Sequence, residues 1–226
     1  MKKYFRKILC RLWGTEKKLI YDIVDKDKYN VIFFDVFDTL IKRKVNSPTD
    51  VFDIVENSIE GTKNDLNEFK KNRILAEKLA RKNLDYHEPT IDDIYVQLEY
   101  ITKETHEKVE NIKNIEIETE MDVCYPDIEM FDLYQAEIEK GKHVFIVTDM
   151  YLSGKVIGKL LEKNGYENYE GVYVSCEARA SKRVGTIFPI ILSELNVKGN
   201  IIHIGDNPLS DYFNPIRKGI SAILIR

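Results

Sequence analysis

The sequence has little cysteine and no long apolar run, and each absence excludes a class of protein. Its three cysteines, Cys10, Cys124 and Cys176, are far apart in a chain of 226 residues. This number and spacing provide neither a disulfide framework nor a cysteine metal site, as expected in a reducing compartment. No stretch is apolar over the length of a bilayer-spanning helix, and none has the features of a secretory leader. We therefore expect a cytoplasmic protein.

An excess of positive charge is also absent. The chain has 34 Lys and Arg residues against 38 Asp and Glu residues, which gives a formal net charge of -4. Proteins that bind nucleic acid neutralise phosphates with a basic face, so we expect no nucleic-acid partner. The hydrophobic fraction of 43% and the charged fraction of 32% are those of an ordinary globular protein, long enough for one domain with an inserted subdomain.

The N-terminus differs from the rest of the chain in charge. Residues 1–14 contain five basic residues and no acidic residue, with apolar side chains at helical spacing between them. This pattern predicts a helix that suits a membrane surface, a protein partner or the body of the protein. Membrane binding through five cations would be weak and reversible. We treat residues 1–27 as an N-terminal basic amphipathic segment, whose membrane contact would place the protein peripherally at the inner face of the membrane.

Short apolar runs alternate with helical patterns along most of the chain. The runs are rich in Val, Ile and Phe, as in strands that are buried on both faces. Gly141 and Gly165 follow two of the helical patterns, where helix ends favour a left-handed residue. The alternation predicts an α/β fold with a doubly wound parallel sheet. The predicted strands are Val31–Asp35, His143–Thr148, Gly171–Ser175, Asn200–Ile204 and Ser221–Ile225, and the predicted helices are 127–140, 154–164 and 186–195.

Residues 45–124 interrupt this alternation. They are polar, low in glycine and helical in pattern, and Thr90 to Asp93 has the composition of a helix start. Because the insertion begins about ten residues after Asp35, we interpret it as a helical cap over the strand ends rather than as decoration elsewhere. The core then comprises residues 28–44 and 125–226.

Polar residues that suit catalysis follow four of the predicted strands. Asp35 ends the first strand, Thr148 ends the second, and Lys182 lies in the loop after the third. Asp206 and Asp211 follow the fourth strand. One strand-end carboxylate often only caps a turn, but the carboxyl ends of parallel strands meet at the edge where open α/β sheets bind their ligands. Four such pieces in order predict a site at that edge.

These pieces resemble the four motifs of the haloacid dehalogenase (HAD) superfamily. The resemblance covers about residues 28–44 and 125–226, and the insertion matches in position and helical character only. It implies a Rossmann-like, doubly wound sheet with an inserted helical cap, a Mg²⁺ cofactor and a small phosphorylated substrate. The wording of three motifs is also similar to a branch associated with bacterial surface-polysaccharide synthesis, which implies a sugar, alcohol or amine phosphate used for a capsule or another surface glycan. The matching residues are Asp35 with Thr39, then Thr148, then Lys182, and then Gly205 and Asp206 with Asp211.

The resemblance also implies a role for each motif residue. Asp35 would attack phosphorus and form an aspartyl phosphate, which water then hydrolyses. Thr148 and Lys182 would bind the phosphoryl oxygens, and Lys182 would keep Asp35 ionised. Asp149 and Tyr151 would contribute to substrate binding. The Mg²⁺ ligands would be Asp35, Asp206, the backbone carbonyl of Phe37 and, directly or from the second shell, Asp211.

Phe37 departs from the pattern of a phosphatase. Phosphatases of this superfamily carry an aspartate two residues after the nucleophile as the general acid, and Phe37 cannot donate a proton. Asp38 is one residue further on and could be the acid, or it could only cap the turn. A residue of the cap or an amine of the substrate could also serve as the acid. Haloacid dehalogenases carry an aromatic residue at this position. A module that binds phosphate or Mg²⁺ without turnover is a third interpretation.

Asp206 favours phosphoryl chemistry among these interpretations. Dehalogenases use no metal and lack the acidic residue that matches Asp206. Without a cation, a second carboxylate beside Asp35 would raise the pKa of Asp35 and make it a poorer nucleophile. We therefore predict an enzyme, a Mg²⁺-dependent phosphoric monoester hydrolase of HAD type that acts on a small phosphorylated metabolite.

Overall fold

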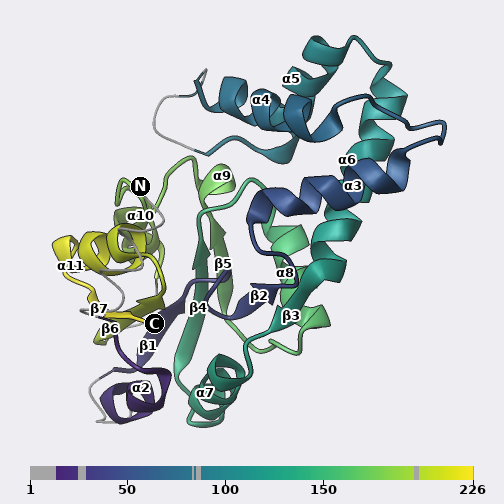
Figure 1. Ribbon diagram of the computed structural model, residues 1–226. Coiled ribbons are helices and arrows are strands. Elements are labelled where there is room, and N and C mark those ends of the chain that lie inside the picture. Colours follow the sequence, from purple (N-terminus) through teal and green to yellow (C-terminus); the bar gives the residue numbers. More distant parts are fainter. Residues whose placement is uncertain (1–13, 25–28, 83, 85–87, 196–198, 226) are drawn as a thin grey trace.

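Five parallel strands form the central sheet of the protein, shown in the computed structural model of Figure 1. The structure describes residues 14–24, 29–82, 84, 88–195 and 199–225. Strand β1 lies in the middle, with β4 and then β5 on one side and β6 and then β7 on the other. This arrangement confirms the predicted doubly wound α/β sheet. The strands are β1 (Val31–Phe34), β4 (His143–Thr148), β5 (Gly171–Val174), β6 (Ile201–Gly205) and β7 (Ser221–Leu224).

Both faces of β1 are buried, which explains its uninterrupted apolar sequence. Successive side chains of a strand point to opposite faces. Val31 and Phe33 pack into the cluster on the face covered by α10. Ile32 and Phe34 pack into the larger cluster on the other face, which α7 and α8 cover. These helices are α7 (Ile128–Glu139), α8 (Gly154–Lys163) and α10 (Ile187–Glu194).

The ends of α7 and α8 agree with their glycine signals. Gly141 and Gly165 have φ angles of 72° and 82°, in the left-handed region that glycine adopts without strain. The strand and helix bounds lie within one residue of the predicted ones. Three short helical segments complete this part of the chain, namely α9 (Ser175–Ala178), the π-helical turn η2 (Pro208–Phe213) and α11 (Asn214–Arg217).

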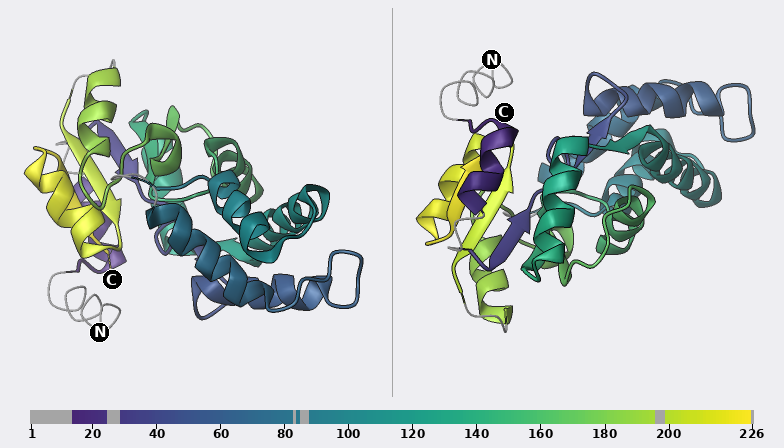
Figure 2. Two further views of the ribbon diagram at one scale, coloured as in Figure 1. Left: turned by 90° about the horizontal axis from the view of Figure 1, so that it is seen from above. Right: turned by 90° about the horizontal axis from the view of Figure 1, so that it is seen from below.

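The described part of the insertion consists mainly of helices and stands beyond the carboxyl ends of the strands, on the side of the sheet edge that carries the site (Figures 1 and 2). The predicted helix start is confirmed, because the Thr90 side chain accepts a hydrogen bond from Asp93 N while the Asp93 carboxylate accepts one from Thr90 N. The helices are α3 (Val51–Ile59), α4 (Phe69–Lys82), α5 (Ile91–Thr102) and α6 (His106–Val123), and a 3₁₀ turn, η1 (Pro48–Asp50), precedes them.

A short antiparallel ribbon joins the insertion to the core, and the sequence did not predict it. Strands β2 (Ile41–Arg43) and β3 (Cys124–Pro126) pair with Arg43 opposite Cys124. Each strand has three residues of mixed polarity, so neither shows the apolar run or the alternation that identifies a strand. The ribbon brings the two ends of the insertion together beside the end of β1.

The described part of the N-terminal segment packs on the core. Helix α2 (Lys17–Val24) buries Ile20 and Val24 completely, and Thr15 bridges to Ile225 beside β7. The helix expected within residues 1–14 lies, apart from Gly14, outside the described residues. None of the helices that the structure describes has the length and apolarity needed to cross a bilayer.

A buried arginine organises the interior of the insertion. Arg73 of α4 is fully buried and forms two hydrogen bonds of 2.8 Å with the Glu116 carboxylate of α6. Tyr95 of α5 donates a third hydrogen bond to Glu116, at 2.8 Å. The Arg73 guanidinium also lies 4.9 Å from the ring centre of Tyr151, a residue of the core. This network ties three helices of the insertion to one another and to the loop after β4.

We predict that Arg73→Ala lowers the free energy of unfolding by about 3–5 kcal/mol, because it leaves the buried Glu116 carboxylate without its cation. Lys71→Ala is the matched control on the same helix. Its ion pair with Glu68 is exposed, so we expect a change of about 0–1 kcal/mol. Urea unfolding followed by circular dichroism measures both values. Equal losses in the two variants would contradict a stabilising role of the buried pair.

Candidate active site

The predicted site residues meet at one edge of the sheet. Asp35 follows β1, Thr148 ends β4 and Asp206 follows β6, which are the three central strands. Lys182 comes from the loop between α9 and α10, and Asp211 from η2. All five line a cavity of about 310 Å³, at the low end of the range for small-molecule sites. The other predicted residues line it too, namely Phe37, Asp38, Asp149 and Tyr151.

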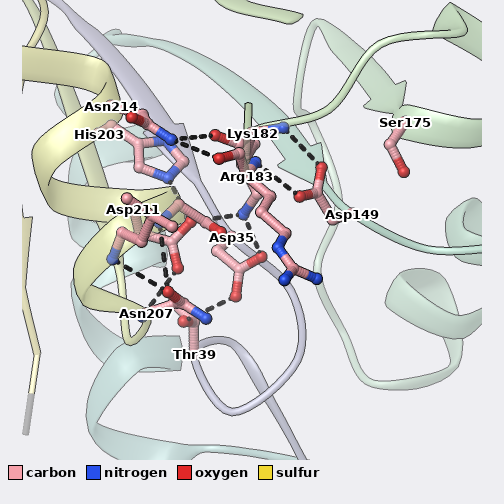
Figure 3. A network of polar contacts seen from close by, with 12 residues as sticks. Asp35, Thr39, Asp149, Ser175, Lys182, Arg183, His203, Asn207, Asp211 and Asn214 are labelled. Carbon is pink, nitrogen blue, oxygen red and sulfur yellow. Dashed lines mark hydrogen bonds and ion pairs between the residues drawn. The ribbon is translucent and has the colours of Figure 1, made fainter. Parts of the chain in front are cut away.

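The Lys182 ammonium lies between two carboxylates at the centre of the site (Figure 3). Lys182 Nζ is 2.5 Å from Asp35 Oδ1 and 2.6 Å from Asp211 Oδ1. All three side chains are buried, with at most 9% of their side-chain surface exposed. Removing charged groups from water costs free energy. The attraction between buried charges offsets this cost only when their contacts are as short and well aligned as these. The ammonium therefore links residues from three separate segments of the core.

The three charges change one another's pKa values. Burial raises the pKa of Asp35 to about 6, although the Lys182 ammonium acts in the opposite direction. Burial lowers the pKa of Lys182, but the Asp211 and Asp35 carboxylates outweigh burial and hold this pKa above its ordinary value. Burial would raise the pKa of Asp211, yet Lys182 and His203 hold it well below its ordinary value. Asp211 is thus ionised, while Asp35 takes up a proton more easily than a free aspartate.

A tight turn holds Asp35 in position. Asp38 N donates to Ile41 O at 2.9 Å, and Thr39 Oγ1 donates to Asp35 Oδ2 at 3.1 Å. Asp38 has a φ angle of 62°, in the left-handed region that aspartate tolerates in turns. Thr39 and Lys182 therefore engage the two different oxygens of Asp35. Asp38 forms the turn with its backbone and is exposed, and its role as an acid stays a prediction.

Three carboxylates form a cluster that suits a divalent cation. One oxygen each of Asp35, Asp206 and Asp211 lies within 4.8 Å of the others. Opposite ligands of a Mg²⁺ ion are about 4 Å apart, and Mg²⁺ prefers carboxylate oxygens, so small side-chain rotations would bring these oxygens to ligand distance. Both Asp211 oxygens already accept hydrogen bonds, from Lys182, His203 and Asn207 N, which favours a positioning role for Asp211 over direct ligation.

Gly205 makes room for Asp211. A Cβ atom on Gly205 would lie 2.5 Å from Asp211 Cγ, closer than such atoms approach in folded proteins. The glycine that precedes Asp206 in the sequence therefore serves packing, since it lets the Asp211 carboxylate come up against β6.

The loop that carries Lys182 is fixed from both sides. The Asp149 carboxylate accepts hydrogen bonds from Lys182 N at 2.8 Å and from Arg183 N at 3.0 Å. The Asn214 amide donates to the carbonyls of the same two residues, at 2.9 and 2.7 Å. Asp149 thus uses both carboxylate oxygens to position Lys182, and its predicted contact with substrate stays a prediction. Asn214 was not predicted, because nothing in the sequence marks a helical asparagine as a loop anchor.

His203, a buried residue of β6, contacts the site through Asp211. His203 Nε2 lies 3.0 Å from Asp211 Oδ1, and the ring packs edge-on against Phe188 at 5.6 Å between centres. Burial lowers the pKa of His203, so the neutral ring donates one hydrogen bond to Asp211. The alternation of β6 could have placed His203 on one face, but its contact with Asp211 depends on how η2 folds back.

The insertion and the ribbon supply the remaining wall of the cavity. Arg43 of β2 donates from Nε to Glu120 Oε1 of α6 at 2.6 Å, and both residues line the cavity. Phe52 and Glu77, from α3 and α4, line it as well. None of these four residues was predicted at the site, because the polar insertion has no motif that distinguishes a cavity residue from a solvated one.

No protein-family model matches this sequence, and no curated protein matches it. Solved structures do resemble the fold. YfnB of Bacillus subtilis, an assigned HAD-hydrolase solved with magnesium bound, has a TM-score of 0.58 and 15% identity, over 87% of this chain and 88% of that chain. A predicted phosphoglycolate phosphatase from Haemophilus somnus has a TM-score of 0.56 and 13% identity, over 88% and 86% of the chains.

A dehalogenase structure is similar to the same extent. L-2-haloacid dehalogenase from Xanthobacter autotrophicus, solved with chloropropionic acid covalently bound, has a TM-score of 0.53 and 12% identity, over 86% of this chain and 76% of that chain. At these identities the similarity establishes the fold, a HAD-like core with an inserted helical cap. It does not separate phosphatases from dehalogenases, so the choice depends on the residues of the site.

We predict that Gly205→Ala lowers the free energy of unfolding by about 1–3 kcal/mol, because the added methyl group displaces Asp211 from a packed position. The control is Gly158→Ala in α8, where the nearest atom is the Tyr169 hydroxyl at 3.3 Å and alanine favours the helix. Chemical unfolding measures both variants. A Gly205→Ala protein as stable as the control variant would show that Asp211 does not need this space.

We predict that the Asp35 carboxyl titrates near pH 6 in the metal-free protein, because burial favours its neutral form. Lys182→Met should raise this pKa further, since it removes the neighbouring cation. Lys159→Met, which changes an exposed lysine of α8, should leave it unchanged. Carboxyl ¹³C NMR of aspartate-labelled protein measures the titration. A wild-type pKa near the ordinary aspartate value of about 4 would contradict the burial argument.

Proposed function

We propose that the protein is a Mg²⁺-dependent phosphatase that hydrolyses a small phosphorylated metabolite through an aspartyl phosphate on Asp35. The observation that carries the proposal is the cluster of Asp35, Asp206 and Asp211 beside the Lys182 ammonium, inside one small cavity. A carboxylate nucleophile, an acidic metal site and a fixed cation are the groups that phosphoryl transfer to an aspartate requires.

Asp35, Asp206 and the Phe37 carbonyl would hold the ion, with Asp211 behind them. Bound there, Mg²⁺ would supply positive charge between the nucleophile and the phosphoryl oxygens. Asp35 would attack phosphorus with one oxygen while Thr39 holds the other by its hydrogen bond of 3.1 Å. Lys182 would bind a phosphoryl oxygen and favour the ionised form of Asp35, and the buried Thr148 hydroxyl would bind another.

The acidic cluster favours phosphatase activity over dehalogenation. A dehalogenase needs no metal ion, and further carboxylates beside its nucleophile would raise the pKa of that nucleophile and make it a poorer one. When a metal ion is bound, Asp206 beside Asp35 would serve as one of its ligands. A module that binds phosphate without turnover is a weaker alternative, because Thr39, Lys182 and the turn together orient Asp35 as a nucleophile.

The volume of the cavity limits the size of the substrate. A volume of about 310 Å³ suits a metabolite of a few carbon atoms. We propose residues 45–124 as the cap and residues 28–44 and 125–226 as the core, with the substrate between them. Use of a sugar, alcohol or amine phosphate for a surface glycan, in the cytoplasm or at its membrane, rests on the resemblance of the motifs.

The test is a screen of small phosphate esters and acyl phosphates, with Mg²⁺ or with a chelator. We expect phosphate release only with Mg²⁺, and a loss of about 10³-fold or more in Asp35→Asn, because the nucleophile is gone. Asp92→Asn, which changes an exposed carboxylate of α5, should retain full activity.

Two other results would contradict the proposal. Metal-independent halide release from 2-chloropropionate would identify a dehalogenase. Mg²⁺ and phosphate binding without turnover of any substrate would identify a binding module.

A further inference from the structure

Arg43 lies against the side chain that occupies the place of the expected proton donor. Its guanidinium carbon is 4.1 Å from the centre of the Phe37 ring, a cation–π contact. Phe37 stands two residues after Asp35, and all three residues line the same cavity. The Phe37 ring, at the position where a phosphatase would carry an acid, therefore supports a cation on the wall of the cavity that also holds the nucleophile.

The guanidinium has hydrogen-bond donors to spare. Among the residues that the structure describes, its only hydrogen bond runs from Nε to Glu120 Oε1. The only buried side-chain polar atoms without a partner in that part of the chain are Glu137 Oε2 and His203 Nδ1. Arg43 Nη1 and Nη2 are therefore accessible, although 90% of the side chain is buried. Arg43 also lines the cavity, so these accessible donors belong to a side chain that borders the space where a substrate would lie.

The surroundings of Arg43 keep it charged and in place. The pairing of β2 with β3 sets its backbone, and Glu120 engages the inner edge of the guanidinium. Burial lowers the pKa of Arg43, but Glu120 outweighs burial and holds this pKa above its ordinary value. The other cation that lines the cavity, Lys182, is engaged by Asp35 and Asp211. Arg43 thus has more donors left for a ligand than Lys182 has.

We propose that Arg43 is a catalytic residue that receives the leaving-group oxygen as an anion, and that the substrate is a small phosphate with a weakly basic leaving group, such as an acyl or enol phosphate. The planar fork of a guanidinium binds oxyanions with two parallel hydrogen bonds. This inference rests on the proposed attack of Asp35 on phosphorus and deepens it by naming the class of substrate, which replaces the sugar, alcohol or amine phosphate that the resemblance of the motifs implies.

In the proposed step, an Asp35 oxygen forms a bond to phosphorus while the bond between phosphorus and the leaving oxygen breaks. The leaving group keeps the electron pair of that bond and departs as an oxyanion beside Arg43. Water then attacks phosphorus, the bond to Asp35 breaks, and Asp35 regains its carboxylate. The proton that this water loses goes to phosphate or to solvent. No general acid takes part, which agrees with the side chain of Phe37.

Magnitudes limit the substrates that this arrangement can serve. A positioned general acid contributes about 10²- to 10⁴-fold in rate, and a donor to a developing oxyanion about 10²- to 10³-fold. Arg43 can therefore replace most of what Phe37 cannot supply when the departing oxygen is weakly basic. A strongly basic alkoxide would still need a proton. Asp38 also lines the cavity and is the competing candidate for its donor.

The experiment compares kcat/KM of the Mg²⁺-loaded wild type for acetyl phosphate, for phenyl phosphates of graded leaving-group acidity and for glycerol phosphate. We expect the acyl and aryl phosphates to react at least about 100-fold faster than the alkyl phosphate. Arg43→Met should lower kcat for acetyl phosphate by about 10²- to 10³-fold with a smaller change in KM, because the contact is strongest in the transition state. Arg43→Lys should restore part of the rate.

Matched variants separate chemistry from folding. Lys44→Met removes an exposed cation next to Arg43 that does not line the cavity, and it should keep the wild-type rate. The double variant Arg43→Met with Glu120→Met removes both charges of the buried pair, so no unpaired carboxylate remains. It should melt cooperatively and remain as slow as Arg43→Met.

Three results would overturn the role of Arg43 and leave the phosphatase intact. One is an Arg43→Met rate equal to that of Lys44→Met. Another is a wild type that prefers alkyl phosphates. The third is an alkaline fall in the pH profile of kcat/KM that Asp38→Asn abolishes, since it would identify Asp38 as the acid. Absence of Asp35-dependent phosphate release from every substrate would instead reject the proposed function, and the role of Arg43 with it.

Discussion

The site depends on one buried ammonium group. Lys182 Nζ contacts Asp35 at the end of β1 and Asp211 in η2, and it balances charges that neither segment could bury alone. The residues around it serve this contact. Asp149 and Asn214 hold the Lys182 loop, and the hydrogen bonds of His203 and Asn207 N fix Asp211. Because each partner comes from a different segment, the ammonium makes the geometry of the nucleophile depend on the whole edge of the sheet.

The parallel sheet and the site residues at its strand ends could be predicted from the sequence. Strands buried on both faces have a clear apolar signal, and a parallel sheet brings their carboxyl ends together, so Asp35, Thr148 and Asp206 could be assigned to one edge in advance. The structure brings every predicted site residue to one cavity. The insertion was also predicted as helical, since its apolar stripes have helical period.

Contacts between distant side chains could not be predicted in the same way. The ribbon of β2 and β3 is too short to show a period, so the position of Arg43 beside Phe37 had no local signal. His203 lies buried in an apolar strand, and its hydrogen bond to Asp211 depends on the π-helical turn η2, which was not predicted. Gly205 belongs to a predicted motif, but the close approach of Asp211 that explains this glycine is visible only in the structure.

The two walls of the cavity thus have different origins. The core wall consists of residues at and after strand ends, whose positions are constrained by both the fold and their charges. This wall would bind the phosphoryl group. The opposite wall, with Arg43, Phe52 and Glu77, comes from the ribbon and the insertion, where few constraints of the fold apply. Chemistry that is common to this fold would reside on the first wall, and the choice of leaving group on the second.

Phosphoryl transfer to Asp35 is best tested by trapping the aspartyl phosphate that it would form. Enzyme and Mg²⁺ are mixed with an equal amount of acetyl phosphate and quenched in acid within one turnover, and the peptides are then analysed by mass spectrometry. We expect a phosphoryl group on Asp35, in the peptide that contains Val36 and Phe37, formed and lost at the rate of turnover. A phosphoryl group on another residue, or phosphate release with Asp35 unmodified throughout the turnover, would contradict it.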